Sequence, residues 1–391
     1  MLNYDKLLKT IPIGPLGIVP LRGCEQMAHA VDNYIVDWRE NAIHSESICS
    51  NIAFADYKKD SFIVKSKVPR FGSGEAKGII NQSIRGDDLY FLVDITNHSL
   101  TYSLCGKTNY MSPDDHFQDL KRLIGAAAGK AKRVNVIMPF LYESRQDKRS
   151  SRESLDCAIA LQELANMGVD NIITFDVHNI AICNAIPLKG FESVRPTYQF
   201  IKSLLAREKD LTIDAEHMMV ISPDEGAMNR AIYFANVLGV DVGMFYKRRD
   251  YSSIIDGRNP IVAHEFLGDD LKGKDVIILD DMISSGDSIL DVAKQLKKRN
   301  ARNVYLAATF GLFTNGLDKF DKAFEEGMFD KVLTTNLTYQ MPELLTKPYF
   351  VNVDMAKYIA LIIETLNHDS SMSSLLDPID RIKRCISNYK K

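Results

Sequence analysis

The feature that most constrains the fold of this chain is an alternation of short apolar runs with helical patterns. Each apolar run is short enough to be one buried strand, and the stretches between them have the 3.6-residue period of amphipathic helices. Buried strands that alternate with helices are typical of a parallel sheet covered by helices on both faces. The expected strands are 89–95, 134–140, 171–177, 218–222, 276–281 and 303–310, and the expected helices are 115–129, 153–167, 225–238 and 287–299.

These units are numerous enough for two sheets, and a chain of 391 residues has room for two domains. We therefore predict an α/β protein with two domains side by side, each a mainly parallel sheet flanked by helices. The first domain is expected over 1–190 and is completed by the C-terminal segment 346–391, which includes a helix near 354–367. The second domain is expected over 191–345.

Two segments interrupt the alternation. Residues 96–114 are polar and aperiodic, and we expect a surface loop there. Residues 248–272 contain glycine and proline punctuation and are expected to form a functional lid or a disordered stretch. Outside these segments the pattern predicts a strand at 17–21 and helices at 25–38 and 379–389.

Composition and charge exclude several classes of function. The net charge is -3, with 48 basic and 51 acidic residues, which argues against broad binding to nucleic acid. The six cysteines are scattered, so neither a zinc site nor a disulfide framework is expected, and a reducing cytoplasm fits them. No apolar run is long enough to cross a bilayer, and proline and glycine break the apolar N-terminus, so neither a membrane partner nor a signal peptide is expected.

The most informative segment is 276–296, where an expected strand leads into two carboxylates, a turn of small residues and a helix. The turn and the helix start present backbone N–H groups and the positive end of a helix dipole, and both favour a phosphate. Gly286 lets the backbone approach an anion closely, and the acid pair is placed to accept hydrogen bonds from sugar hydroxyls. The pattern indicates a ribose 5-phosphate site, although acids at this point also commonly cap a helix. The candidate residues are Asp280, Asp281, Ser284, Ser285, Gly286, Asp287 and Ser288.

Six further segments occur in a characteristic order. They read RFGSGE at 70–75, IRGDD at 84–88, SRQDKR at 144–149, FDVHN at 175–179, SPDEG at 222–226 and KRR at 247–249. Together with the acid pair, these segments resemble the ribose-phosphate pyrophosphokinases. This family has the type I phosphoribosyltransferase fold, so the resemblance implies two phosphoribosyltransferase-type domains. Salvage phosphoribosyltransferases are usually shorter and lack two of the segments.

The resemblance also implies roles for single residues. It places ATP on Phe71, Glu75, Arg145, Gln146 and Asp147, with the first two contributed by a neighbouring subunit. Arginine donors suit a triphosphate, although such a charged run is often only a solvated loop.

The resemblance further gives His178 and Asp224 a role in binding Mg²⁺, and Lys247 and Arg249 a catalytic role in a mobile loop. A lone histidine is more often a satisfied polar residue than a ligand, and Mg²⁺ prefers oxygen ligands. Strand alternation is expected to put His178 on the same side as Asp176.

The implied reaction moves the β,γ-diphosphoryl group of Mg-ATP to the 1-hydroxyl of ribose 5-phosphate, at the carboxyl ends of the strands between the domains. The family also implies a homo-oligomer, a hexamer in its known members. Several residues depart from the family pattern, among them Ser73, Ala227 and Asp287, and a carboxylate at the last position is awkward beside a phosphate. These three motivate one alternative, a non-catalytic regulatory homologue. A salvage phosphoribosyltransferase is a further alternative.

Overall fold

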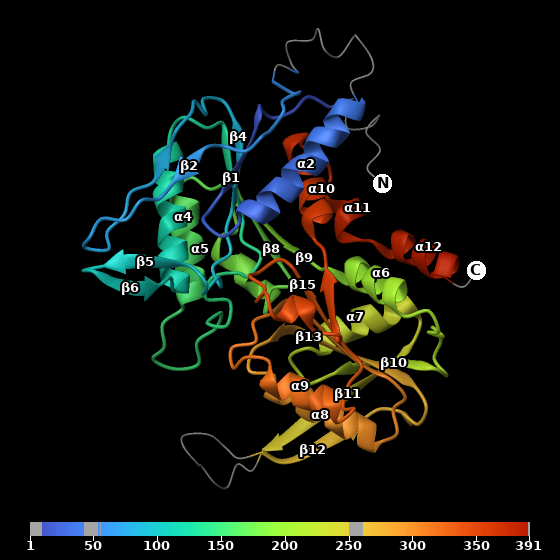
Figure 1. Cartoon of the computed structure of the whole chain (residues 1–391). Coiled ribbons are helices and arrows are strands. Elements are labelled where there is room, and N and C mark those ends of the chain that lie inside the picture. Colours follow the sequence, from blue (N-terminus) through green and yellow to red (C-terminus); the bar gives the residue numbers. More distant parts are fainter. Residues whose placement is uncertain (1–9, 43–53, 55, 250–260, 390–391) are drawn as a thin grey trace. The chain divides into compact units, whose positions relative to one another are not determined.

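The computed structural model describes residues 10–42, 54, 56–249 and 261–389, with the side chains of 247–249 and 261–264 outside the description. The chain divides into two compact units (Figure 1). The first comprises Met1–Arg195, Leu337–Tyr339 and Asp354–Asp377, and the second comprises Pro196–Asn336, Gln340–Val353 and Pro378–Lys391. The C-terminal segment is thus shared between the units, whereas the sequence placed all of 346–391 with the first.

The first unit contains a five-stranded parallel sheet with the order β1-β4-β7-β8-β9. Its inner strands are almost wholly buried, which explains why they read as continuous apolar runs. The strands are β1 (Leu16–Pro20), β4 (Asp88–Leu92), β7 (Arg133–Ile137), β8 (Asn171–Phe175) and β9 (Gly190–Val194).

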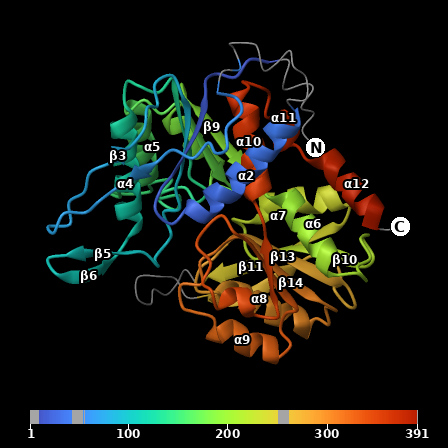
Figure 2. The same cartoon turned by 45° about the horizontal axis from the view of Figure 1, so that its top comes forward.

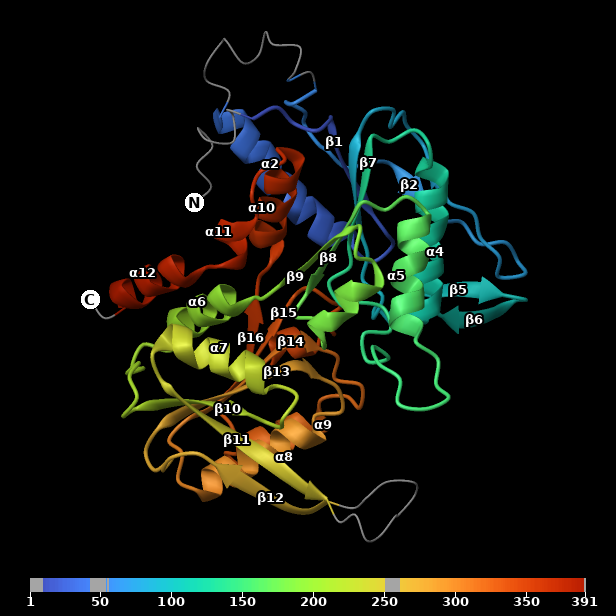
Figure 3. The ribbon, with the colours of Figure 1, turned by 180° about the vertical axis from the view of Figure 1, so that it is seen from behind.

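Helices cover both faces of this sheet (Figure 3). Helices α2 (Glu25–Ala42) and α10 (Ala356–Asn367) lie side by side on one face, although they are far apart in the sequence. Helices α4 (Pro113–Ala127) and α5 (Asp156–Asn166) pack on the other face and share its apolar core. A capping box at Ser112 and a proline at the first helical position define the start of α4. The smaller elements are β2 (Ser66–Lys67), β3 (Ile79–Ile80), α11 (Ser373–Leu376) and a 3-10 helix (Ile180–Ala185).

A buried polar network holds α10 in the first unit. The guanidinium of Arg39 on α2 donates to the carboxylate of Glu364 at 2.6 Å and to the side chain of Asn367 at 2.9 Å. Asn367 also donates to Asp88, which accepts two further bonds from Arg133. These charges are paired, as the burial of ionised groups requires.

The segment 96–114 is not the expected surface loop. It contains an antiparallel hairpin of β5 (Thr101–Leu104) and β6 (Lys107–Tyr110). The two turn residues, Cys105 and Gly106, have φ values of 48° and 78°. Two successive positive φ values are typical of the tight type I′ hairpin turn, but cysteine is an unusual residue at the first position. The prediction was wrong because neither the turn nor the polar strands carry the usual sequence signals.

The second unit contains a seven-stranded sheet with the order β12-β11-β10-β13-β14-β15-β16. Within the described part of this sheet, the edge pair β11–β12 is antiparallel and the other strand pairs are parallel. The expected break at 248–272 therefore contains a strand, while 250–260 lie outside the described residues. The strands are β10 (Met218–Ser222), β11 (Asp241–Arg249), β12 (Ile261–Leu267), β13 (Asp275–Ile283), β14 (Val304–Gly311), β15 (Lys331–Thr335) and β16 (Phe350–Val353).

Helices also flank the sheet of the second unit on both faces (Figure 2). The C-terminal helix, predicted at 379–389, lies at those residues and packs on α6 and α7. Tyr389 of this helix donates to the carbonyl of Glu208 and accepts from the N–H of Leu211. None of the helices in the described ranges is both long and apolar enough to span a membrane. The helices are α6 (Thr197–Arg207), α7 (Met228–Leu238), α8 (Asp287–Lys298), α9 (Asp318–Glu325), α12 (Ile379–Tyr389) and a 3-10 helix (Leu344–Thr346).

Candidate active site

The expected ATP-binding stretch lies in the loop that follows β7, at the carboxyl edge of the first sheet. Arg145 is exposed, and Gln146 and Asp147 are half-buried. The side chain of Gln146 donates to the carbonyl of Ser154 at 2.8 Å. The carboxylate of Asp147 accepts from Asn179 at 2.5 Å. This loop is therefore tied to the loop that follows β8.

Asn179 is a residue that the sequence reading missed. Its amide nitrogen donates to Asp147, while its amide oxygen accepts from the N–H of Ala181 and caps the 3-10 helix. It follows His178 directly, so it brings the expected metal-binding segment and the expected ATP-binding stretch together. The cap position of an asparagine before a helical turn was the only signal available in the sequence.

Strand alternation had predicted that His178 and Asp176 lie on the same strand face, but they do not. Strand β8 ends at Phe175, and Asp176 has a φ of 42°, so the alternation stops before the two residues. Asp176 is buried and His178 is exposed. A left-handed φ in a residue other than glycine is uncommon and concentrates at functional sites.

The loop 70–76, which is expected to hold adenine, is compact, and its two candidate residues, Phe71 and Glu75, are exposed. The N–H of Phe71 donates to the carbonyl of Glu75 at 2.7 Å, and the ring of Phe71 is 51% exposed. Ser73 donates to the carboxylate of Glu75 at 2.9 Å, so the serine at this departure from the family pattern orients the acid. The loop's other contacts go to β5–β6 and to α4.

The acid pair of the second unit lies inside strand β13, which continues to Ile283, so it does not end the strand as predicted. The N–H of Asp281 donates to the carboxylate of Asp280 at 2.9 Å. Arg230 on α7, a residue that the sequence reading missed, places a guanidinium nitrogen 4.0 Å from Asp281. Burial is the main cause that raises the pKa of Asp280 well above its usual value, and the negative charge of Asp281 adds to it while Arg230 opposes it.

The turn after this strand, where the sequence predicted a phosphate site, has a left-handed backbone at Gly286. Gly286 caps α8 with a φ of 84°, and a Cβ there would lie 2.5 Å from the ring of Phe320. Both the left-handed backbone and the close approach need glycine at this position. The N–H of Thr314 donates to the carbonyl of Ser284 at 3.0 Å and braces the turn against the chain after β14. Ser285 is half-buried and Ser288 is exposed.

Asp287, the awkward carboxylate, is paired with a cation. The ammonium of Lys319 on α9 donates to the carboxylate of Asp287 at 2.5 Å. The bond from Lys319, together with one from Ser285, lowers the pKa of Asp287. Thirty-two residues separate the partners, so no local pattern announces the pair.

Asp224 follows β10 and shapes its own loop. One carboxylate oxygen accepts from the N–H groups of Gly226 and Ala227, at 3.0 and 3.3 Å. Ala227, where the family pattern has glycine, has ordinary helical angles of −86° and −4°. This departure therefore introduces no backbone strain.

Lys247 and Arg249 lie at the end of β11, where the register with β12 shifts between Arg248 and Arg249. The sequence reading placed them at the start of an aperiodic loop, whereas the backbone here is a strand edge. Their side chains lie outside the described residues.

The donor chemistry of the candidate residues fits Mg²⁺ only in part. Among the described residues no group of three histidine, cysteine, aspartate or glutamate side chains gathers as a ready ligand set. Mg²⁺ is commonly held by one or two carboxylates together with substrate phosphates and water, and so needs no complete cage of protein ligands. The carboxylates of Asp224 and Asp280 are oxygen donors of the required kind.

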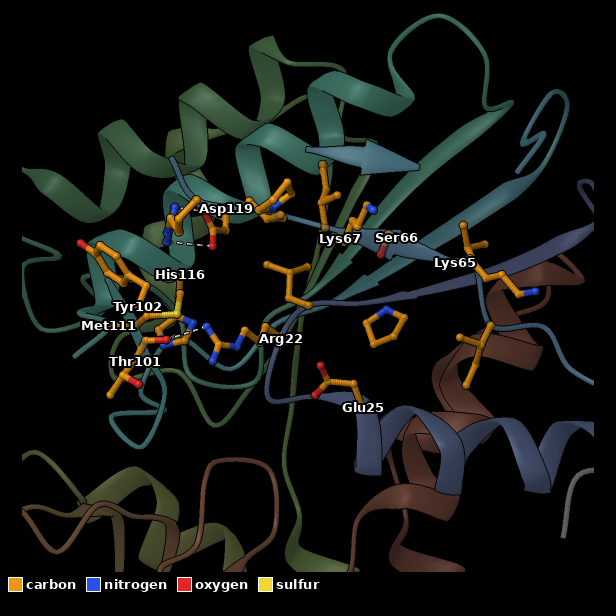
Figure 4. A pocket seen from close by; sticks show the side chains of 18 of the residues that line it. Arg22, Glu25, Lys65, Ser66, Lys67, Thr101, Tyr102, Met111, His116 and Asp119 are labelled. Atoms are coloured by element: carbon orange, nitrogen blue, oxygen red, sulfur yellow. Dashed lines mark hydrogen bonds and ion pairs between the residues drawn. The ribbon is translucent and has the colours of Figure 1, made fainter. Parts of the chain in front are cut away.

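A cavity of about 630 Å³ lies elsewhere in the first unit, and none of the predicted site residues lines it. Its walls come from the end of β1, the start of α2, residues 63–70 and the β5–β6 hairpin (Figure 4). Arg22 spans it and donates to the carbonyl of Thr101 at 2.8 Å.

Two parallel sheets flanked by helices, with a glycine-capped turn after a strand that carries two acids, define a protein of the phosphoribosyltransferase-type class. Within that class, the chain belongs to the ribose-phosphate pyrophosphokinase family. Residues 18–168 match the model of the N-terminal domain of ribose phosphate pyrophosphokinase, and residues 264–377 match that of the phosphoribosyl synthetase-associated domain.

Individual relatives agree with this assignment. The ribose-phosphate pyrophosphokinase of Vibrio parahaemolyticus is 27% identical over 80% of this chain and 91% of its own length. That of Shewanella oneidensis is 28% identical over 79% of this chain and 89% of its own length. The crystal structure of phosphoribosylpyrophosphate synthetase from Mycobacterium smegmatis, at 22% identity, covers 91% of this chain and 99% of that one with a TM-score of 0.69. The family and the fold class predicted from the sequence are thus confirmed.

Proposed function

We propose that this chain is a ribose-phosphate diphosphokinase. It transfers the β,γ-diphosphoryl group of ATP to the 1-hydroxyl of ribose 5-phosphate and releases AMP. Family membership supports the reaction class. The observation that carries the assignment to this chain is the phosphate turn, since Gly286 has the required backbone and the carboxylate of Asp287 is held by Lys319.

The ribose 5-phosphate residues are Asp280, Asp281 and the turn 284–288. Backbone N–H groups at the start of α8 bind the 5-phosphate, since a helix N-terminus favours an anion. The acid pair accepts hydrogen bonds from the sugar hydroxyls, and Arg230 limits the repulsion between the two carboxylates. The sugar is thereby fixed with its 1-hydroxyl free to react.

ATP binds to Arg145, Gln146 and Asp147, with its base against Phe71 and Glu75. The hydrogen bond from Asn179 fixes the carboxylate of Asp147, which gives the loop a defined conformation before ATP arrives. A ring that is 51% exposed suits stacking on a base. The family implies that the neighbouring subunit of a homo-oligomer contributes this pair.

In the transfer itself, the oxygen of the 1-hydroxyl forms a bond to the β-phosphorus as the bond from that phosphorus to the bridging oxygen of AMP breaks. The hydroxyl proton passes to water, the electron pair of the broken bond stays on the phosphate oxygen of AMP, and no covalent enzyme intermediate forms. Lys247 and Arg249 stabilise the charge that develops on the transferring group, since such reactions depend mainly on alignment and neutralised charge. Mg²⁺, held by His178 and Asp224, would supply further neutralisation of phosphate charge when bound. The scattered cysteines support a cytoplasmic location.

The direct test is turnover. Purified protein with ATP, Mg²⁺ and ribose 5-phosphate should form AMP and 5-phosphoribosyl 1-diphosphate in equal amounts. Lys247→Ala should lower kcat by about 10²-fold or more, because it removes one transition-state cation. Lys298→Ala, which removes an exposed lysine at the end of α8, is the matched control and should leave kcat unchanged.

The outcomes distinguish the alternatives. No turnover, together with altered turnover of an active synthetase added to the assay, would indicate a regulatory homologue. Consumption of 5-phosphoribosyl 1-diphosphate in the presence of a free base would indicate a salvage enzyme. The ordinary backbone of Ala227 and the pairing of Asp287 favour the catalytic assignment, because these departures motivated the regulatory one.

A further inference from the structure

The β5–β6 hairpin has no place in the proposed reaction, yet it is built onto the loop that carries Phe71 and Glu75. The N–H of Cys105 at its turn donates to the carbonyl of Gly72 at 2.8 Å. This bond joins the tip of the hairpin to the tip of the loop 70–76. A backbone bond between two tips restricts both of them.

Side chains reinforce the joint. A Cβ at Gly74, whose φ is 90°, would lie 2.6 Å from a methyl carbon of Leu104, so the loop is closed directly onto the hairpin. At the base of the loop, the guanidinium of Arg70 lies 4.7 Å from the ring centroid of Tyr102. A cation over an aromatic face at this distance is attractive.

The base of the loop is in turn fixed to α4. Arg70 makes two bonds to the carboxylate of Asp119, at 2.7 and 3.0 Å, and Tyr102 donates to Asp115 at 3.2 Å. Figure 4 shows Tyr102 and Asp119 on the same side of the cavity. Loop, hairpin and helix thus form one braced unit.

The exposure of Phe71 is what this bracing maintains. A large apolar ring would bury itself if the loop were free, and the glycines at 72 and 74 give the loop that freedom. The bonds from Phe71 to Glu75 and from Gly74 to Phe71 are made within the loop, whose further contacts include the hairpin and α4. The ammonium of Lys77 also lies 5.9 Å from the ring centroid of Phe71. The hairpin therefore keeps the ring of Phe71 and the carboxylate of Glu75 exposed.

We propose that the β5–β6 hairpin is a positioning element for nucleotide binding, acting through Leu104 and Tyr102 on the loop 70–76. This inference rests on the proposed function, in which Phe71 and Glu75 bind the base. Ordering a loop when a ligand binds weakens the affinity, and a loop that is ordered beforehand avoids that loss. The hairpin thus sets the affinity for ATP and leaves the chemical step alone.

The first test separates KM from kcat. Leu104→Ala, and replacement of residues 101–110 by two glycines, should raise KM for ATP on the order of tenfold, the effect of one freed residue. The kcat and the KM for ribose 5-phosphate should stay within about twofold of wild type. Thr108→Ala, on the exposed side of β6, is the matched control and should change nothing. Equal KM values for ATP in wild type and both variants would overturn the proposal.

A double-mutant cycle tests the route of the effect. If the hairpin acts through the loop, Leu104→Ala should add nothing to the KM of a Phe71→Ala protein, because the ring that the hairpin positions is already absent. Additive increases in KM would show that the hairpin acts elsewhere and would overturn the positioning role.

Hydrogen exchange supplies a readout that needs no activity. The amides of Phe71 and Gly74 are bonded inside the loop, so their exchange should be faster in Leu104→Ala and unchanged in Thr108→Ala. Unchanged exchange in Leu104→Ala would overturn the proposal. If wild-type protein makes no product, the proposed function fails by itself, and calorimetric titration with ATP then decides: the same Kd in wild type and Leu104→Ala overturns the inference, and a weaker Kd in the variant supports it.

Discussion

At the scale of single residues, Asp280 combines a proposed role in binding ribose 5-phosphate with a cost in stability. Its raised pKa means that the folded chain holds this proton more tightly than the unfolded chain does. The loss of folding stability caused by ionised Asp280 is therefore absent below the ordinary aspartate pKa of 3.8. It grows as the pH rises through the higher pKa that Asp280 has in the folded state. Functional sites commonly tolerate buried like charges, because activity needs these groups although they lower stability.

We therefore expect Asp280→Asn to raise the Tm at pH 7.5, since the amide oxygen still accepts from the N–H of Asp281 and the charge is gone. The gain should vanish near pH 4, where the wild-type carboxyl is protonated. The same variant should bind ribose 5-phosphate more weakly. Thermal unfolding across this pH range tests the gain in Tm, and measurement of KM for ribose 5-phosphate tests the weaker binding. A lower Tm for Asp280→Asn at pH 7.5 would show that the charge of Asp280 does not lower stability.

Lys319 is a second residue for which we make a prediction, based on its contact with Asp287. Lys319→Met leaves the carboxylate of Asp287 unpaired at the start of α8, where it repels the substrate phosphate. KM for ribose 5-phosphate should rise severalfold while KM for ATP stays constant. Because both partners are exposed, stability should change by less than about 1 kcal/mol.

The matched variant for this prediction is the double substitution Lys319→Met with Asp287→Gly, which removes both charges and should restore KM. Lys322→Met, on the same helix and exposed, should have no effect. A double variant as impaired as the single one would show that Lys319 acts independently of Asp287.

At the scale of elements, the pairing of α2 with α10 depends on a buried ion pair. Arg39 and Glu364 are 1% and 0% exposed. Removal of one partner leaves the other charge buried and unpaired, which typically costs about 3–5 kcal/mol. Arg39→Met should therefore lower the free energy of unfolding by that amount in urea denaturation.

An exposed pair that involves Glu40 on α2 gives the control. Lys58 lies 3.9 Å from Glu40, and both side chains are more than half exposed. Lys58→Met should change the free energy of unfolding by less than about 1 kcal/mol. Similar losses in Arg39→Met and Lys58→Met would mean that burial does not govern the α2–α10 pair.

At the scale of the whole molecule, the chain leaves the first unit at Arg195 and returns to it briefly at Leu337–Tyr339 and again at Asp354–Asp377. Helix α10 contributes buried residues to that unit, among them Ile359, Ile362 and Ile363. The first unit therefore lacks part of its core until the C-terminal region has been made.

Two truncations test this dependence. A chain that ends after Val353 loses α10 and should aggregate or lack a cooperative melt for the first unit. A chain that ends after Asp377 loses only α12 and should retain that melt. Solubility and circular dichroism melts distinguish them, and equal behaviour of the two truncations would contradict the division.

The sequence by itself determined the alternation of strands and helices, the helix at 379–389 and the turn around Gly286. All three depend on local physics: hydrophobic period, caps and the φ range of glycine. The hairpin in 96–114 escaped because Cys105 is not a usual residue for a tight turn. The strand at Ile261–Leu267 escaped because it lies in a segment with Gly257, Pro260 and Gly268, which the sequence reading took as one break in the alternation.

Only the tertiary structure decided which distant residues support the candidate site residues. Asp287 is paired with Lys319, Asp147 with Asn179, and the loop 70–76 with Leu104, each across about thirty residues of sequence. The raised pKa of Asp280 likewise depends on burial and on Arg230, which comes from another element. Contacts of this kind leave no local pattern, because they follow from which segments the fold of each unit brings together.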